Sequence, residues 1–204
     1  MLCVAAGTAV AEDVGIAILG DSLVAGYGLK AEEGLVPQLQ GWLDDKGVAV
    51  RLINAGVSGD TTAGGLARLD WTLGPEVDAL VVSLGANDFL RGLPPEAARE
   101  NLEGIVSRAT DKSLPVMIIG FRSPANWGPD YKTAFDDIYP ELAERYETIF
   151  MPFFFEPLAS DGATSSLLSL LQPDGLHPNE AGVAKLVEVI GPYVVDLAAR
   201  IEAE

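Results

Sequence analysis

The run Val-Gly-Ile-Ala-Ile-Leu at residues 14–19 is almost continuously apolar and leads directly into Gly20, Asp21, Ser22 and Leu23. Such a run, bounded by turn-forming residues, is typical of a parallel β-strand that is buried on both faces. It predicts a strand over residues 14–19, with a serine shortly beyond the carboxyl end of that strand.

Similar apolar runs recur along the chain and alternate with longer amphipathic stretches. Further strands are predicted over residues 48–54, 79–84, 116–120 and, more weakly, 148–151. Helices are predicted over residues 35–46, 62–72, 95–111, 131–146 and 179–201. The irregular stretch around residues 152–173 is either a loop or carries short helices such as one over 165–171. This alternation predicts an α/β fold with right-handed crossovers and three layers, α/β/α.

Three residues mark helix boundaries. Pro95 suits a first helical position, and Asn179 suits an N-cap before Glu180. Gly47, which follows Lys46, suits the stop at a helix C-terminus.

Composition excludes several classes of function. The 204 residues include 30 acidic and 13 basic side chains, a formal net charge of −17. This balance argues against nucleic acid and against anionic lipid as partners, because both reward clustered Lys and Arg. The 49% share of hydrophobic residues argues against disorder. No run is long and apolar enough to span a membrane, so stable insertion is not expected.

Cysteine and histidine occur once each, as Cys3 and His177. The chain therefore has no internal disulfide and cannot build a Cys/His zinc site. A magnesium or calcium site made of carboxylates alone stays open, although no calcium-binding loop pattern is visible.

The first residues, up to Ala11, are small and apolar and end in Ala9-Val10-Ala11. This small-x-small pattern resembles the end of a secretory signal and predicts cleavage after Ala11, leaving a single domain over residues 12–204. The positively charged beginning of such a signal is absent, and a short N-terminal extension is the alternative. Cleavage would imply a periplasmic or secreted protein.

Ser22 and His177 are candidates for nucleophilic catalysis. A nucleophilic serine needs an exposed hydroxyl and a base, and Gly20 and Asp21 could form a turn that presents Ser22. Asp174 precedes His177 by three residues with Gly175 between them, so the carboxylate could orient the imidazole. Taken singly, these segments could also be an ordinary strand-to-helix turn and a helix-entry turn.

Two further segments could stabilise an oxyanion. Gly59 follows the second predicted strand, and its backbone N–H could approach a substrate closely. Asn87 follows the third, where its amide could donate a hydrogen bond. Each could equally be a plain turn residue. The order Ser, Gly, Asn, His, at predicted strand ends and in a late loop, is stronger evidence for a catalytic site than any single segment.

These segments resemble the four sequence blocks of the GDSL/SGNH hydrolase superfamily, from residue 14 to the last helix. The blocks are Gly20-Asp21-Ser22-Leu23, Gly59, Gly85-Ala86-Asn87-Asp88 and Asp174-Gly175-Leu176-His177. The runs Gly26-Tyr27 and Leu90-Arg91-Gly92 make the chain similar to the bacterial periplasmic arylesterase, thioesterase and lysophospholipase branch.

The resemblance implies a flavodoxin-like sandwich with a central parallel sheet of about five strands. It implies that Ser22 is the nucleophile, His177 the base and Asp174 its orienting acid. The oxyanion hole would consist of Ser22, Gly59 and Asn87. No cofactor is implied, the expected partner is a small acyl ester or thioester, and the oligomeric state is left open, with a monomer compatible with the sequence.

Apolar stretches near these segments suggest where an acyl chain could bind. Phe89, Leu170 and Leu171 are the candidate contacts, whereas the residues 153–155 are expected to pack in the core. One alternative is a carbohydrate acetyl esterase, in which Trp71 or Trp127 would stack on sugar rings. Another is a non-catalytic binding module on the same scaffold. A nucleotide or flavin binder is disfavoured because no glycine-rich phosphate loop follows a strand.

Overall fold

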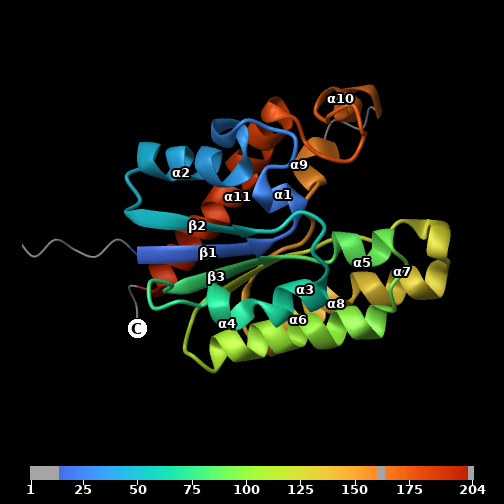
Figure 1. Ribbon diagram of the computed structural model, residues 1–204, viewed down its shortest axis with the longest axis horizontal. Helices are drawn as coiled ribbons and strands as arrows, with labels where there is room; N and C mark the ends of the chain where they lie inside the picture. The colour runs from blue at the N-terminus through green and yellow to red at the C-terminus, as the bar shows by residue number, and fades with distance from the viewer. Residues whose placement is uncertain (1–13, 160–163, 202–204) are drawn as a thin grey trace, which may run out of the picture.

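The computed structural model describes residues 14–159 and 164–201 (Figure 1). The strands are β1 (Val14–Gly20), β2 (Val50–Gly56), β3 (Ala79–Ser83), β4 (Val116–Ile119) and β5 (Ile149–Met151). They form one parallel sheet in the order β2-β1-β3-β4-β5. The predicted α/β fold with a five-stranded parallel sheet is confirmed. The predicted signal segment, residues 1–11, lies outside the described residues.

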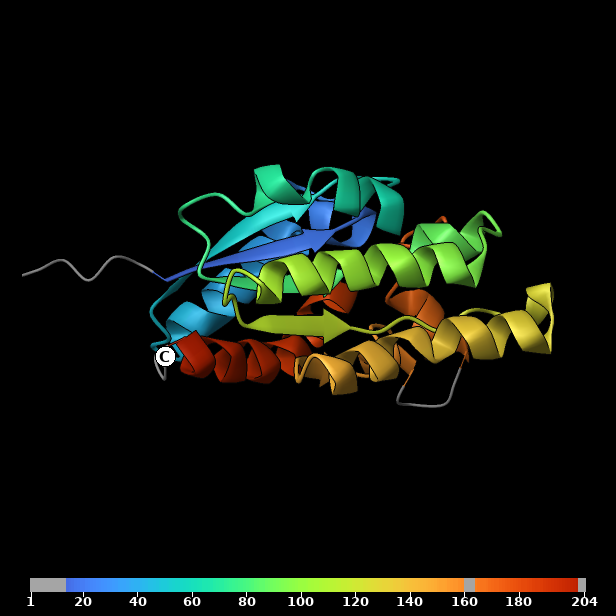
Figure 2. The same ribbon diagram turned by 90° about the horizontal axis from the view of Figure 1, so that it is seen from below.

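Helices cover both faces of this sheet. They are α1 (Ser22–Ala25), α2 (Leu35–Asp45), α3 (Thr62–Ala67), α4 (Leu69–Thr72), α5 (Ala86–Leu90), α6 (Pro95–Thr110), α7 (Pro129–Asp136), α8 (Ile138–Arg145), α9 (Glu156–Ala159), α10 (Thr164–Ser169) and α11 (Glu180–Ile201), with short 3-10 helices η1 (Ala31–Glu33) and η2 (Ala125–Trp127). Helices α2 and α11 pack together on one face, whereas α3 and α6 pack together on the other, where α8 contacts α6 (Figures 1 and 2).

The central strands form the core because they are apolar on both sides. Every residue of β3 is buried, and Ile16 and Leu19 of β1 have no exposed surface. Burying one such aliphatic side chain contributes about 1.5–3 kcal/mol relative to leaving it in water. This rigid centre supports the loops at the carboxyl ends of the strands.

The three predicted helix boundaries are confirmed. Pro95 is the first residue of α6. The Asn179 Oδ1 atom accepts a hydrogen bond of 3.0 Å from the Gly182 N–H at the start of α11. Gly47 has a φ of +72°, the left-handed conformation that commonly ends a helix.

Two predicted helices are each divided in the structure. The helix expected over 62–72 breaks at Arg68, whose guanidinium binds the Asp60 carboxylate at 2.7 Å and the Gly20 carbonyl at 3.0 Å. The helix expected over 131–146 breaks at Asp137. Pro140 explains this second break, because proline has no N–H for the carbonyl four residues earlier and its ring crowds that carbonyl.

Candidate active site

The loops that follow β1, β2 and β3 meet at one edge of the sheet, because parallel strands end on the same side. Ser22 is the first residue of α1, directly after β1, and Asp21 is the N-cap of that helix. A side chain at Gly20 would collide with Val24, since an added Cβ would lie 2.2 Å from a Val24 methyl group. Glycine therefore permits the tight turn that carries Ser22.

Ser22, His177 and Asp174 form a continuous hydrogen-bonded series. The Ser22 Oγ atom lies 2.8 Å from His177 Nε2, and His177 Nδ1 lies 2.7 Å from Asp174 Oδ2. A carboxylate only accepts hydrogen bonds, so Nδ1 carries a proton and a neutral ring presents Nε2 as an acceptor to Ser22. Ser22, which is distant in the sequence from Asp174 and His177, is thus brought next to them.

The Asp174 carboxylate is held in its charged form. Its Oδ1 atom accepts hydrogen bonds from the backbone N–H groups of Leu176 at 2.9 Å and His177 at 3.0 Å. These bonds, together with the bond from the His177 ring, lower the pKa of Asp174 from 3.8 to about 2. The carboxylate therefore stays ionised near neutral pH.

The turn that carries His177 is fixed to the rest of the site. Gln172 donates from its backbone N–H to the His177 carbonyl at 2.7 Å and from its side chain to the Tyr27 carbonyl at 2.8 Å. The Tyr27 ring also packs against the His177 ring, with centroids 4.7 Å apart. Tyr27 thus restricts the orientation of the imidazole, and the sequence did not reveal this contact.

The expected oxyanion donors face the same cavity as Ser22. Gly59 has a φ of +84°, which L side chains rarely adopt, and its carbonyl accepts a hydrogen bond of 2.6 Å from Arg91. Asn87 lies in the first turn of α5, and its Nδ2 atom donates to Asp21 Oδ2 at 3.1 Å. The first N–H of α1, that of Ser22, has no acceptor inside its helix.

A second buried carboxylate, Asp88, links the loops that carry these donors. It accepts hydrogen bonds from the Thr62 backbone at 2.9 Å and the Thr62 hydroxyl at 2.6 Å. Burial raises the pKa of Asp88 above its ordinary value. Because Thr62 begins α3 and Asp88 follows Asn87, this contact holds α3 and α5 in fixed relation.

Asp21 is nearly inaccessible to solvent, with 1% of its surface exposed. Burial raises its pKa from 3.8 to about 6, although hydrogen bonds from the Leu23 backbone and the Asn87 side chain oppose the shift. The charge of Asp21 is therefore set by its surroundings, which the sequence alone did not indicate.

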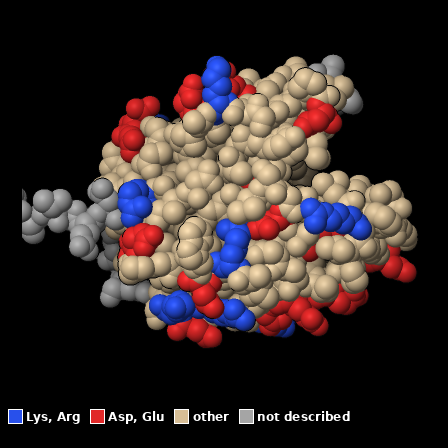
Figure 3. All heavy atoms as spheres, viewed as in Figure 1, with Lys and Arg blue, Asp and Glu red and all other residues tan. Residues whose placement is uncertain are grey.

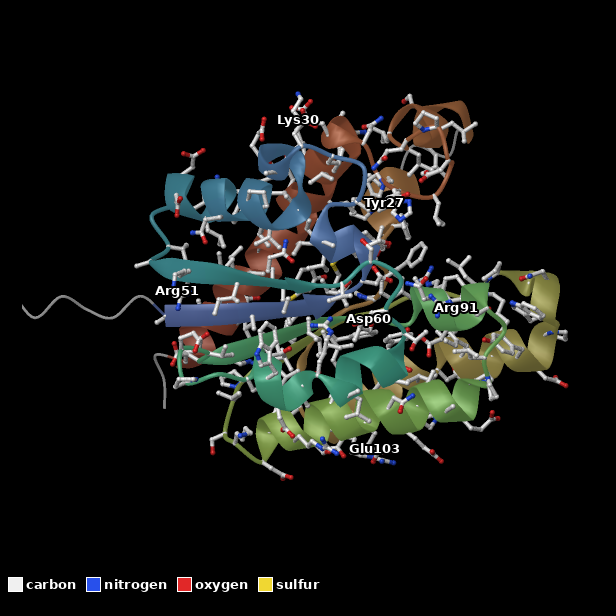
Figure 4. The ribbon with its side chains drawn as sticks, in the orientation of Figure 1. Tyr27, Lys30, Arg51, Asp60, Arg91 and Glu103 are labelled. Atoms are coloured by element: carbon white, nitrogen blue, oxygen red, sulfur yellow. The ribbon has the colours of Figure 1, made fainter. Side chains whose placement is uncertain are left out.

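A cavity of about 210 Å³ opens beside Ser22. It is lined mostly by apolar side chains, and the surface is hollowed at this edge of the molecule (Figure 3). The lining residues are Asp21, Ser22, Leu23, Tyr27, Ser58, Gly59, Ala86, Asn87, Phe89, Leu90, Phe155, Leu176 and His177. Figure 4 shows Tyr27, beyond α1, and Arg91, beyond α5, on opposite sides of this opening.

The expected acyl contacts divide into two groups. Phe89 lines the cavity, whereas Leu170 and Leu171 are not among its lining residues, and contact of any of the three with an acyl chain stays a prediction. Leu170 is 8% exposed and packs in the core, and the backbone of Leu171 pairs with Pro178, next to His177, in an isolated β-bridge. Among residues 153–155, Phe154 packs in the core as predicted, whereas Phe155 lines the cavity.

Neither tryptophan considered for sugar binding lines the cavity. Trp71 is 83% exposed on α4, and the Trp127 indole N–H donates to the Phe89 carbonyl at 2.7 Å. Trp127 therefore holds the backbone of the segment around Phe89 in place. Within residues 14–159 and 164–201, no cluster of three potential metal ligands from His, Cys, Asp and Glu occurs.

Comparison with known proteins agrees with this geometry. Residues 18–185 match the model of the GDSL-like lipase/acylhydrolase family. The chain is 39% identical to the esterase TesA of Pseudomonas aeruginosa over 181 residues, which cover 88% of this chain and 87% of that protein. It is 38% identical over 185 residues to thioesterase 1/protease 1/lysophospholipase L1 of Escherichia coli K12, covering 90% of this chain and 80% of the relative.

A solved structure gives the same result in three dimensions. The crystal structure of TesA superposes with a TM-score of 0.80 and 37% identity, covering 90% of this chain and 99% of that one. The chain therefore belongs to the GDSL-like lipase/acylhydrolase family and is a serine esterase of the GDSL type.

Proposed function

We propose that Ser22 attacks the carbonyl carbon of an acyl ester, with His177 as the general base and Asp174 as the residue that orients His177. One observation carries the proposal, the continuous series from Ser22 Oγ to His177 to Asp174 with contacts of 2.8 and 2.7 Å. A neutral imidazole in this position can accept the hydroxyl proton as the new bond forms.

The oxyanion of the tetrahedral intermediate is held by three donors. They are the backbone N–H groups of Ser22 and Gly59 and the side-chain amide of Asn87. Losing one such donor raises the barrier by about 2.7–4 kcal/mol in comparable enzymes. Collapse of the intermediate releases the alcohol with the proton from His177, and water activated by the same residue then releases the acid from the acyl-enzyme.

The substrate is a small carboxylic ester or thioester with a short to medium acyl chain. The cavity supports this choice because it is about 210 Å³ in volume and lined by Phe89, Phe155 and Leu176. Relatives named as an esterase and as a thioesterase and lysophospholipase are consistent with it. The reaction needs no cofactor. Sugar esters are not favoured, since neither Trp71 nor Trp127 lines the cavity.

We further propose that residues 12–204 act as a single catalytic domain after export and removal of residues 1–11. The pattern Ala9-Val10-Ala11 supports this cleavage. In the described part of the chain, no helix is both long and apolar enough to cross a bilayer. N-terminal sequencing of protein recovered from the periplasm tests the proposal, and a protein that stays in the cytoplasm with Met1 retained would contradict it.

The catalytic proposal is tested with p-nitrophenyl esters from acetate to palmitate, together with acyl thioesters of the same lengths. We expect Ser22→Ala to reduce kcat by roughly four to six orders of magnitude, as for other serine hydrolases that lose their nucleophile. Ser107→Ala, on α6 away from the cavity, is the matched control and should retain full activity. Turnover that survives Ser22→Ala would exclude this mechanism and favour a non-catalytic binding module.

A further inference from the structure

Both carboxylate oxygens of Asp21 accept hydrogen bonds, and they do so from two different parts of the site. Oδ1 accepts from the Leu23 backbone N–H at 3.0 Å, which caps the helix that begins at Ser22. Oδ2 accepts from the Asn87 Nδ2 atom at 3.1 Å. With 1% of its surface exposed, Asp21 has no access to bulk water as an alternative partner.

This contact decides which end of the Asn87 amide faces the cavity. The Nδ2 atom carries two hydrogens, and one of them is directed to Asp21, which leaves the other for the oxyanion. A rotation of the amide by 180° would exchange nitrogen for oxygen at this position. The oxygen would then face both Asp21 and the developing oxyanion, and it would repel both.

We propose that Asp21 is a positioning residue for ester hydrolysis, which holds the Asn87 amide with its nitrogen toward the oxyanion by accepting hydrogen bonds at both carboxylate oxygens. This inference rests on the proposed role of Asn87 as an oxyanion donor. It gives the aspartate of the Gly20-Asp21-Ser22-Leu23 turn a chemical task distinct from that of Asp174.

An amide of the same shape cannot perform this task. In Asp21→Asn, one orientation of the new side chain retains the bond from Leu23 but directs an NH₂ group at the Asn87 NH₂ group. Relief then requires Asn87 to rotate, and its oxygen enters the oxyanion site. The other orientation directs the NH₂ group at the Leu23 N–H and breaks the cap of α1. Both arrangements impair the site while the side-chain volume is unchanged.

A double-mutant cycle tests the inference through the enzyme's own activity. We measure kcat and KM on p-nitrophenyl butyrate for the wild type, Asp21→Asn, Asn87→Ala and the double variant. Removal of one oxyanion donor lowers kcat by about 10²–10³-fold. We expect each single variant to lose kcat by this order, with KM within about threefold of the wild type. The kcat of the double variant should lie within about threefold of that of Asn87→Ala, because the two residues act as one unit.

Asp78→Asn is the matched control, since Asp78 also accepts a backbone hydrogen bond, from Gly15 at 2.7 Å, but lies at the opposite end of the sheet. It should leave kcat unchanged, and circular dichroism should show that all variants fold. If Asp21→Asn reduces kcat equally in both backgrounds, or leaves it unchanged, the inference is wrong while the proposed function stands. If Asn87→Ala itself leaves kcat unchanged, the oxyanion role of Asn87 fails and the inference fails with it.

Discussion

Replacing Asp21 with asparagine should stabilise the folded protein at neutral pH even though it impairs catalysis. Burial raises the pKa of Asp21 from 3.8 to about 6, which means that the folded state disfavours the charged carboxylate. Each pKa unit corresponds to about 1.36 kcal/mol, so the shift of roughly two units amounts to about 3 kcal/mol. Asparagine carries no charge and avoids this cost.

The sign of the pH dependence follows from proton binding. Below pH 3.8 the carboxyl is protonated in both the folded and the unfolded chain, so Asp21 contributes no pH dependence. Between about pH 4 and 6 the unfolded chain releases its proton first, and the free energy of unfolding of the wild type falls as pH rises. Above about pH 6 the full cost of about 3 kcal/mol is present.

The assay is urea unfolding of the wild type and Asp21→Asn between pH 4 and 8. All other titrating groups are shared, so the difference in unfolding free energy between the two proteins isolates Asp21. As pH rises from 4 to 8, we expect the unfolding free energy of Asp21→Asn to increase relative to that of the wild type by up to about 3 kcal/mol. At pH 4 the variant should be less stable by about 1 kcal/mol, because it loses one hydrogen bond.

Asp174→Asn, compared with the wild type by the same urea unfolding between pH 2 and 5, is an internal control of opposite sign. The pKa of Asp174 is lowered to about 2, so its contribution is present above pH 3.8 and is lost as pH falls toward 2. The wild type should therefore gain stability over Asp174→Asn as pH rises through this range, by an amount that solvent reduces because the side chain is 39% exposed. A constant difference between wild type and Asp21→Asn from pH 4 to 8 would refute the reasoning on Asp21.

Substitutions at three further positions test the cavity. Gly59→Ala should lower both kcat and the melting temperature. The φ of +84° strains an L residue, and the new Cβ would lie 3.4 Å from an Arg91 nitrogen. Unchanged values of both quantities would contradict this expectation. Tyr27→Ala should lower kcat several-fold, because it frees the His177 ring. Tyr27→Phe keeps the ring contact and should have the kcat of the wild type. Equal losses of kcat in both variants would indicate that the Tyr27 hydroxyl is responsible instead. Phe155→Ala should move the preferred p-nitrophenyl ester to a longer acyl chain, and an unchanged chain-length profile would remove Phe155 from the acyl site.

Local sequence was sufficient for the strands and for the order of the site residues. A run such as residues 14–19 is apolar at almost every position and is bounded by turn-forming residues, which at that length is typical of a strand buried on both faces. Pro95, Asn179 and Gly47 act through their own backbones or through residues within one turn, so their roles could be recognised without a fold. Asp174 and His177 are close enough in the chain for their contact to be foreseen.

Tertiary packing decided the features that depend on residues distant in the chain. Arg68, where α3 gives way to α4, binds Asp60 and the Gly20 carbonyl. Leu170 is buried in the core although the apolar run containing it also suited an acyl contact. The cavity wall combines Tyr27, Phe155 and Leu176, which no single periodic pattern connects. The raised pKa of Asp21 likewise depends on burial by the surrounding chain, and desolvation is a property of the folded environment rather than of the residue itself.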